Sequence, residues 1–209
     1  MGQVLASGAP LARARAAAIM VHGRGGSAED ILSLGEEFGF DDIAYVAPQA
    51  ANGAWYPYSF LAPIADNEPY LGNALGVLAA TFADLARAGF AAERVALIGF
   101  SQGGCLALEY AARNARRYGA IAGLSAGLIG PRGSPLAHPG SLAGTPVFLG
   151  CSDVDGHIPL ARVHESRDVL GKMGAAVTER IYPGMGHTVN EDEIAHVRNL
   201  LAGIAAGDA

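Results

Sequence analysis

The sequence has few cysteines and few charged residues for its length. Cys105 and Cys151 are the two cysteines in 209 residues, and they form no Cys-x-x-Cys pattern. A disulfide framework and a structural zinc site are therefore disfavoured, no metal or other cofactor is expected, and the expected compartment is a reducing one, the cytoplasm. Charged residues make up 16% of the chain, with a formal net charge of -6 and no block of like charge. Nucleic-acid binding is disfavoured, because a protein that binds nucleic acid usually has a clustered basic face.

Long hydrophobic runs are also missing. No apolar stretch approaches the length of about 18 residues that a membrane-spanning helix needs, so no stable membrane insertion is expected. The apolar segment 14–21 contains Arg15 and leads directly into a polar, glycine-rich loop, which favours a strand over a signal-peptide core. Hydrophobic residues nevertheless make up 51% of the chain, enough for one large core. We therefore expect a single domain over residues 1–209.

Strand-like and helix-like segments alternate along the chain. Short, nearly continuous apolar runs predict strands at 16–21, 42–47, 95–98, 120–124 and 147–150, and a more mixed segment at 177–182 predicts the last strand. Helical periodicity and capping residues predict helices that begin near residues 27, 67, 102, 159 and 190. The alternation predicts an α/β fold with a mostly parallel central sheet and helices on both faces. Active sites in such sheets lie beyond the carboxyl ends of the strands.

Smaller features complete the expected organisation. Residues 3–6 and 10–14 are expected to form a short N-terminal hairpin around Gly8. Three polar residues that precede helical patterns are the expected N-caps: Ser27, Asn67 and Asn190. Two long stretches rich in proline are expected to be irregular, 48–66 and 127–144. These loops are the places to look for substrate contacts.

One stretch carries a specific chemical pattern, Gly99-Phe-Ser101-Gln-Gly103. An apolar strand pattern precedes it and an alanine-rich helical pattern follows, which is the context that a G-x-S-x-G nucleophile turn requires. The glycines leave room for the flanking strand and helix at this sharp turn. The helix N-terminus beyond it favours negative charge. Ser101 is therefore the expected nucleophile, with an incidental serine in a glycine-rich turn as the alternative.

A serine nucleophile needs a base, and the base needs an orienting acid. In this kind of fold the chain order is Ser, then Asp or Glu, then His. His187 follows the last predicted strand in a glycine-rich loop, so it is the expected base. The acid should follow the strand before that one, where Asp153 and Asp155 compete; spacing to the next helix favours Asp155. Three further histidines after Ser101 suit the base less well by position: His138, His157 and His196.

Main-chain amides are expected to stabilise the oxyanion. One is the N–H of Gln102, the residue after the nucleophile, and the other comes from the glycine-rich loop that follows strand 16–21. Arg24 in that loop is the candidate for the second amide. Its guanidinium either reaches the pocket, where it would favour an acidic substrate group, or lies in solvent; the sequence leaves both open. The pocket itself is expected to take residues from the two irregular stretches: Trp55, Tyr58, Leu128 and Ile129. These side chains would suit a small or medium apolar ester.

Together these motifs resemble the α/β-hydrolase superfamily. Within it, the chain is similar to the small phospholipase/carboxylesterase group, which includes acyl-protein thioesterases and bacterial carboxylesterases. The resemblance covers almost the whole chain and implies an α/β-hydrolase fold with a Ser-His-Asp triad. The chain departs from the group pattern at Arg24, where members have leucine, and at Cys151-Ser152, where they often have His-Gly. Members are often homodimers, which leaves a homodimer open here.

The expected function is hydrolysis of small-molecule carboxylic esters by a serine hydrolase. Dienelactone hydrolases are similar in size and fold but use a cysteine nucleophile, so Ser101 disfavours that activity. Three alternatives use the same triad: a thioesterase, a lysophospholipase or a lactonase. A different class also remains open, a catalytically silent protein of the same fold that binds a small apolar ligand.

Overall fold

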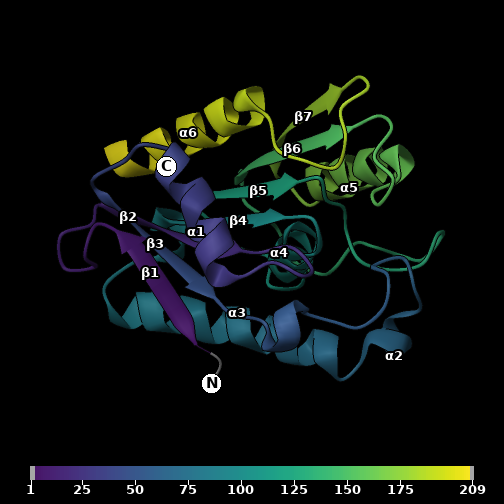
Figure 1. Ribbon diagram of the computed structural model, residues 1–209, viewed down its shortest axis with the longest axis horizontal. Helices are drawn as coiled ribbons and strands as arrows, with labels where there is room; N and C mark the ends of the chain where they lie inside the picture. Colours follow the sequence, from purple (N-terminus) through teal and green to yellow (C-terminus); the bar gives the residue numbers. More distant parts are fainter. Residues whose placement is uncertain (1–2, 208–209) are drawn as a thin grey trace.

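A seven-stranded sheet runs through the molecule, and all its strands but the first are parallel. The computed structural model describes residues 3–207. The strand order is β1-β3-β2-β4-β5-β6-β7, with β1 antiparallel to β3 at one edge (Figure 1). The strand bounds are β1 (Val4–Gly8), β2 (Ala16–Val21), β3 (Ile43–Pro48), β4 (Val95–Phe100), β5 (Ala120–Leu124), β6 (Pro146–Ser152) and β7 (Ala176–Tyr182). The predicted mostly parallel sheet is confirmed.

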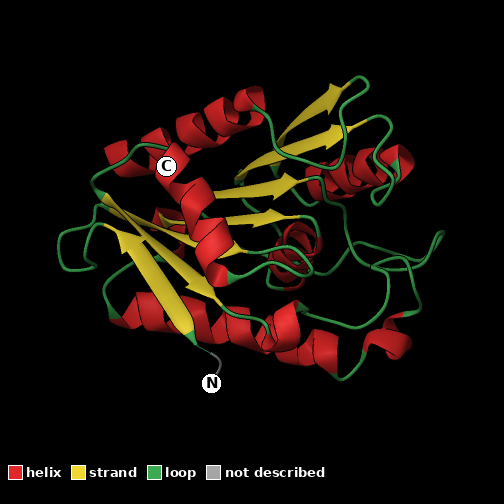
Figure 2. Ribbon diagram, in the orientation of Figure 1, coloured by secondary structure: helices red, strands yellow, loops and turns green. Residues whose placement is uncertain are grey.

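Helices cover both faces of this sheet (Figures 1 and 2). α1 (Ala28–Glu37) and α6 (Glu191–Ala206) pack on one face. Three helices pack on the other: α3 (Tyr70–Arg87), α4 (Gln102–Arg113) and α5 (Leu160–Lys172). Short helices lie in the connections, namely α2 (Ile64–Asn67) and the 3-10 turns η1 (Ala51–Gly53) and η2 (Ala92–Arg94). The layering confirms the predicted α/β class.

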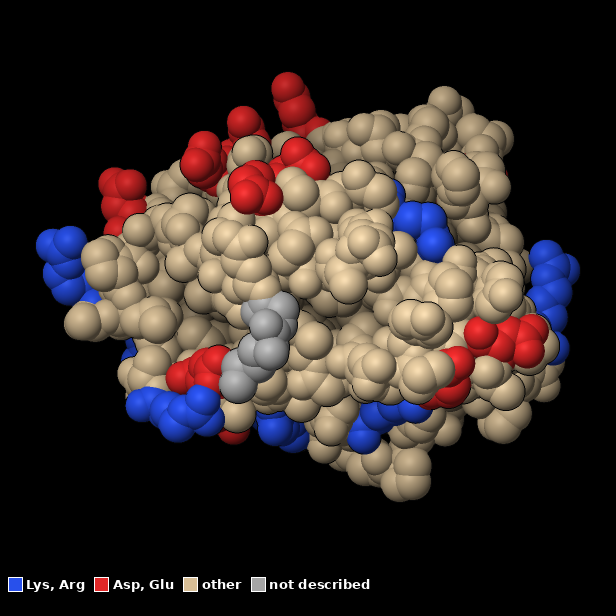
Figure 3. Space-filling view, turned by 60° about the horizontal axis from the view of Figure 1, so that its bottom comes forward, with Lys and Arg blue, Asp and Glu red and all other residues tan. Residues whose placement is uncertain are grey.

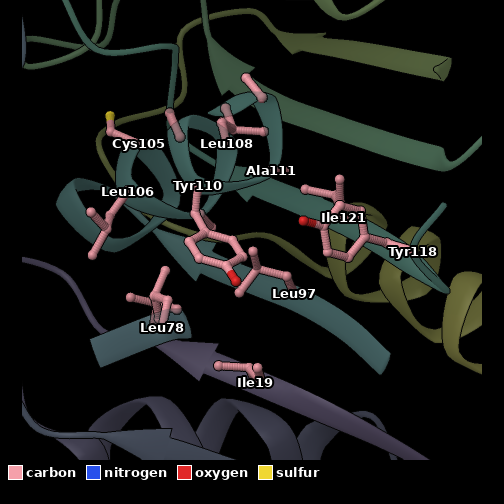
Figure 4. Packing of buried hydrophobic residues seen from close by; sticks show 14 of the residues in the cluster. Ile19, Leu78, Leu97, Cys105, Leu106, Leu108, Tyr110, Ala111, Tyr118 and Ile121 are labelled. Carbon is pink, nitrogen blue, oxygen red and sulfur yellow. The ribbon is translucent and has the colours of Figure 1, made fainter. Parts of the chain in front are cut away.

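The central strands are buried on both faces, which explains their continuous apolar sequences. On β2, Ile19 points into the layer with α3 and α4, whereas Met20 points into the layer with α1 and α6. Figure 4 shows the first layer, where Leu97 of β4 and Ile121 of β5 meet α4 side chains such as Leu108. Because successive residues of a strand face opposite sides, a strand between two helical layers must be apolar at every position.

Two of the three predicted N-caps are confirmed as complete capping boxes. The Ser27 hydroxyl accepts from the Asp30 amide, and the Asp30 carboxylate accepts from the Ser27 amide. Asn190 and Glu193 make the same reciprocal pair at the start of α6. Each pair satisfies two backbone N–H groups that have no partner within the helix.

The predicted N-terminal hairpin is wrong. β1 pairs with β3, far along the chain, and residues 11–13 form a turn. The turn is closed locally by the amides of Arg13 and Ala14, which donate to Pro10 O. Arg15, the residue before β2, donates its amide N–H to Asp42 O. The chain therefore enters β2 directly after the turn. β2 lies in the interior of the sheet beside β3 and does not pair with β1.

The predicted cap at Asn67 is also wrong, because α3 begins at Tyr70. Asn67 ends α2, and its buried side chain holds the loop before it. Its Oδ1 accepts from the Tyr58 amide at 2.9 Å, and its Nδ2 donates to Ser59 O at 3.0 Å. A polar residue before a helical pattern thus turned out to organise a loop instead of a helix end.

The outer surface adds two observations. On the face shown in Figure 3, lysine and arginine side chains lie singly or in small groups among acidic ones, with wide uncharged areas between them. Basic charge on this face is therefore dispersed.

Among the described residues, no helix combines the length and the apolar composition needed to cross a lipid bilayer.

Candidate active site

Ser101 sits on a sharp turn between β4 and α4. Its backbone lies at φ 55° and ψ -122°, in the positive-φ region that side-chain-bearing residues rarely adopt. The Ser101 amide donates to Leu124 O of the neighbouring strand at 2.9 Å, and the Cys105 amide donates to Ser101 O at 2.9 Å. These two bonds hold the strained residue from both sides. The turn is therefore built into the sheet, and Ser101 lies at the N-terminus of α4.

The glycines of the turn are required by close backbone contacts. A Cβ on Gly99 would lie 2.4 Å from Gly103 O, and a Cβ on Gly103 would lie 2.2 Å from Val21 O. No real side chain tolerates such distances. α4 therefore packs its first turn directly onto the ends of β4 and β2, which only glycine permits.

His187 joins Ser101 to Asp155 in one hydrogen-bonded chain. The Ser101 hydroxyl lies 2.8 Å from His187 Nε2, and His187 Nδ1 lies 2.7 Å from Asp155 Oδ2. A neutral ring that accepts from the serine must carry its proton on Nδ1 and donate it to the carboxylate. The three side chains come from loops after three different strands, β4, β6 and β7. The structure thus brings together the three residues that chain order had predicted.

The Asp155 carboxylate is held in its ionised form. Burial raises its pKa, but hydrogen bonds from His187 and from the amides of His157 and Ile158 outweigh that, so its pKa lies below the ordinary value. Asp153 has a different contact. Its Oδ1 accepts from the Gly184 amide at 2.8 Å and so fixes the loop that carries the histidine. The geometry therefore favours Asp155 as the partner of His187.

The His187 ring is flanked by two other rings. Phe100 lies 5.0 Å away and His157 lies 4.7 Å away, measured between ring centroids. His157 itself is exposed. The Ser152 hydroxyl donates to Met185 O, which ties the β6 end to the histidine loop. These neighbours leave the imidazole little freedom to turn.

The other three histidines after Ser101 have contacts away from it. His164 Nδ1 lies 2.9 Å from Glu179 Oε1. His138 lies 3.2 Å from the buried carboxylate of Glu109. His196 stacks on Phe148 with ring centroids 4.7 Å apart. Within residues 3–207, no three His, Cys, Asp or Glu side chains gather into a group that could hold a metal ion.

The loop after β2 lies against the nucleophile turn. A Cβ on Gly23 would sit 3.4 Å from the Ser101 Cβ, so the main chain there passes close to the serine. His22 is buried, with its Nε2 accepting from the Ala50 amide at 3.1 Å and its Nδ1 2.8 Å from Gly23 O. This loop is the neighbour that an oxyanion site needs beside the amide of Gln102.

Arg24 and Gln102 both use their side chains to hold one loop. The Gln102 amide group accepts from the Trp55 N–H at 3.0 Å and donates to Tyr56 O at 2.8 Å. The Arg24 guanidinium donates to Tyr56 O and Tyr58 O at 2.8 Å and to Pro57 O at 3.0 Å. Arg24 is an exposed residue, and neither alternative drawn from the sequence included this contact with main-chain carbonyls. Sequence reasoning missed these loop contacts because their partners are backbone atoms more than thirty residues away.

A cavity of about 530 Å³ opens beside Ser101. Its lining includes Ser101, Gln102, His187, Arg24 and Tyr58, and it is completed by Tyr56, Pro57, Ser59, Phe60, Cys105, His157 and Ile158. Of the four predicted pocket residues, Tyr58 lies in this lining. Phe60 and Ile158 supply apolar surface that the sequence analysis did not assign to the pocket.

The other three predicted pocket residues lie outside the lining. Trp55 is buried, because its indole N–H donates to His22 O at 2.8 Å and draws the ring inward. Leu128 and Ile129 are buried in the core. Arg162 on α5 donates to Leu128 O at 2.7 Å, and the Ile129 amide donates to Glu109 Oε2 at 3.2 Å. Buried polar partners on two helices hold residues 128–129 in the core. The lining of this cavity therefore includes none of the three, and their contact with a substrate stays a prediction.

Both cysteines are buried. Burial raises the pKa of Cys105 and of Cys151 to about 12. The Cys151 thiol lies 3.8 Å from Asp155 Oδ2, the oxygen that also contacts His187. Neither thiol has the lowered pKa of a reactive cysteine.

Comparison with known proteins agrees with this architecture. A crystal structure of a phospholipase/carboxylesterase from Dyadobacter fermentans has a TM-score of 0.92 and 44% identity, covering 97% of this chain and 97% of that chain. Acyl-protein thioesterase 1 of Neurospora crassa is 27% identical over 91% of this chain and 87% of that protein. Acyl-protein thioesterase 1 of Gibberella zeae is 32% identical over 54% of this chain, and the match spans about half of that protein, 49%. A family model described as Phospholipase/Carboxylesterase matches residues 6–204. The chain therefore belongs to the phospholipase/carboxylesterase family of hydrolases and has the α/β-hydrolase fold.

Proposed function

We propose that the chain is a serine hydrolase that cleaves carboxylic esters of small to medium apolar substrates through an acyl-enzyme on Ser101. The observation that carries the proposal is the unbroken chain from Ser101 Oγ through His187 to Asp155, at 2.8 Å and 2.7 Å. It ends on a serine exposed to a cavity, at a helix N-terminus. A catalytically silent protein of the same fold would have no need for this geometry.

In the proposed reaction, His187 Nε2 takes the Ser101 proton while the oxygen attacks the ester carbonyl carbon. The carbonyl oxygen becomes an oxyanion that accepts from the amides of Gln102 and Arg24. The tetrahedral intermediate collapses, and the leaving alkoxide takes the proton from the imidazolium. Water then attacks the acyl-enzyme through the same base and releases the acid. Asp155 keeps the His187 proton on Nδ1 and stabilises the imidazolium.

The cavity supports a substrate of limited size. Its volume of about 530 Å³ lies within the range of about 300–1,000 Å³ that is typical of small-molecule sites. Phe60 and Ile158 offer apolar surface for the acyl or alcohol portion, whereas Tyr58 and Ser59 offer hydroxyl groups. A substrate of this kind would be a free small-molecule ester.

The direct test is Ser101→Ala with p-nitrophenyl acetate and butyrate. Turnover should fall by about four orders of magnitude or more, because the variant keeps the fold and loses the nucleophile. A fluorophosphonate probe should label the unsubstituted protein and leave the variant unlabelled. Near-normal turnover in Ser101→Ala, or no labelling of the unsubstituted protein, would overturn the proposal.

A thioester substrate is the second candidate, favoured by the names of two relatives, both acyl-protein thioesterase 1. The same acyl-enzyme would form, with a thiolate as the leaving group. Matched p-nitrophenyl esters and acyl thioesters of increasing chain length separate the candidates. Higher kcat/KM for the thioesters at every chain length would favour a thioesterase.

A further inference from the structure

The Arg24 guanidinium is fixed at the wall of the cavity that contains Ser101. Its Nη2 donates to Tyr56 O and Tyr58 O, and its Nη1 donates to Pro57 O. A guanidinium has five N–H donors, so two remain after these three bonds, one on Nε and one on Nη1. The head group is therefore held in place and still has donors to offer.

Among the described residues, the positive charge of Arg24 has no acidic partner. In the part of the chain that the structure describes, no carboxylate pairs with it, and no Asp or Glu lines the cavity. The three carbonyl oxygens orient the guanidinium and carry no net charge to neutralise it. Arg24 thus brings a positive charge to the lining of the cavity, in a chain whose formal net charge is -6, and because Arg24 is exposed, solvent screens part of this charge.

Arg162 provides an internal contrast. It also clamps main-chain carbonyls, those of Leu128, Gly130 and Pro131. Arg162 additionally pairs with Glu165, at 2.9 Å. Holding a loop by its carbonyls is therefore compatible with a carboxylate partner, which Arg24 lacks among the described residues.

We propose that Arg24 selects substrates that carry an anionic group, a carboxylate, close to the ester bond that Ser101 cleaves. This inference rests on the proposed function and narrows its substrate class. A carboxylate in the cavity would gain Coulomb attraction from the fixed guanidinium and a hydrogen bond from one of its remaining N–H groups. Phe60 and Ile158 would contact the apolar part of the same substrate.

A purely structural role for Arg24 makes a different prediction. If the side chain only holds the 56–58 loop, removing it should slow neutral and anionic esters equally. Asn67 offers the matched control, because its uncharged side chain holds the same loop through the Tyr58 amide and Ser59 O. Asn67→Ala loosens the loop without changing the charge at the cavity.

The experiment measures the ratio of kcat/KM for anionic and neutral members of two substrate pairs. One pair is p-acetoxybenzoate and its methyl ester, with the charge on the alcohol side. The other is mono-p-nitrophenyl adipate and its methyl ester, with the charge on the acyl side. In at least one pair, Arg24→Gln should lower the ratio by about tenfold, Arg24→Lys should keep most of it, and Asn67→Ala should leave it unchanged. Raising the salt concentration from about 0.02 M to about 0.5 M should reduce the preference of the unsubstituted enzyme.

Calorimetry makes the answer independent of turnover. Binding of p-acetoxybenzoate and its methyl ester, and of the adipate pair, is measured in Ser101→Ala with and without Arg24→Gln. Tighter binding of the anion that depends on Arg24 supports the inference. If the unsubstituted enzyme also turned over no ester, the proposed function would be overturned and the inference about Arg24 would stand. A ratio that Arg24→Gln leaves unchanged in both pairs, in rates and in binding, overturns the inference and leaves ester hydrolysis standing.

Discussion

At the scale of single residues, the site depends on a division of work between two neighbouring aspartates. Asp155 contacts the His187 ring, whereas Asp153 contacts the backbone of the loop that carries this histidine. The first contact controls which ring nitrogen bears the proton, and the second controls only where the loop lies. The two residues therefore differ in how much their charge matters.

This difference predicts unequal effects of the same substitution. Asp155→Asn should lower kcat roughly a thousandfold or more, because an amide Nδ2–H facing the ring favours the wrong histidine tautomer. Asp153→Asn should cost less than about tenfold, since Asn Oδ1 can still accept from the Gly184 amide. Steady-state kinetics on p-nitrophenyl butyrate compares the two variants. A larger loss in Asp153→Asn would contradict the assignment.

At the scale of elements, the buried end of α6 combines a cap with an isolated carboxylate oxygen. Glu193 is fully buried; its Oε2 accepts from the Asn190 amide, and its Oε1 has no hydrogen-bond partner among the described residues. Burial raises the Glu193 pKa from 4.5 to about 7, and the Asp192 charge adds to the increase. The folded protein therefore binds this proton more tightly than the unfolded chain does.

The consequence is a pH-dependent stability with a defined sign. The contribution of Glu193 is fully present below the unfolded pKa of 4.5 and is lost as the pH rises through about 7. Glu193→Gln cannot ionise, so its free energy of unfolding should vary less between these two pH values. Urea unfolding at several pH values in that range measures the free energy of unfolding of the unsubstituted protein and of Glu193→Gln. An equal slope in the variant would assign the pH dependence to other groups.

The nucleophile turn is an element in which backbone contact replaces side-chain packing. Gly103→Ala places a methyl group 2.2 Å from Val21 O, so it should lower the free energy of unfolding by about 3 kcal/mol. Gly76→Ala, at an exposed position of α3, meets nothing within 4 Å and should raise it by about 0.5–1 kcal/mol. Urea unfolding measures both. Equal changes in the two variants would contradict the packing described for α4.

The elements that the sequence predicted well are those whose signal is local. Strands β2 to β6 were evident from continuous apolar runs, and Ser101, Asp155 and His187 followed from chain order together with the strand ends. The failures involve contact partners that the local sequence pattern does not reveal. Leu128 is apolar whether it lines a cavity or the core, and only Arg162, thirty-four residues further on, decides between them. Asn67 has the composition of a cap, but its partners are loop atoms.

At the scale of the whole molecule, one sheet joins two helical layers and both ends of the described chain. We therefore expect residues 3–207 to unfold in one cooperative step. Trp55, the single tryptophan of the sequence, is buried with its indole N–H on His22 O, so its fluorescence reports on the loop after β2. Far-UV circular dichroism reports on all helices. The urea transitions followed by tryptophan fluorescence and by circular dichroism should have the same midpoint. A fluorescence transition at lower urea than the dichroism transition would indicate that the loop region unfolds separately.

The parallel arrangement also places the carboxyl ends of β4 to β7 on one side of the molecule and their amino ends on the opposite side. Ser101, Asp155 and His187 all follow the carboxyl ends of strands, whose arrowheads point the same way for β4 to β7 in Figure 1. Gly89 lies in an exposed turn before the amino end of β4, where an added Cβ would meet nothing within 4 Å. A tether attached at this turn would hold the protein to a solid support by the side remote from its cavity. Immobilisation there leaves the cavity open to solvent.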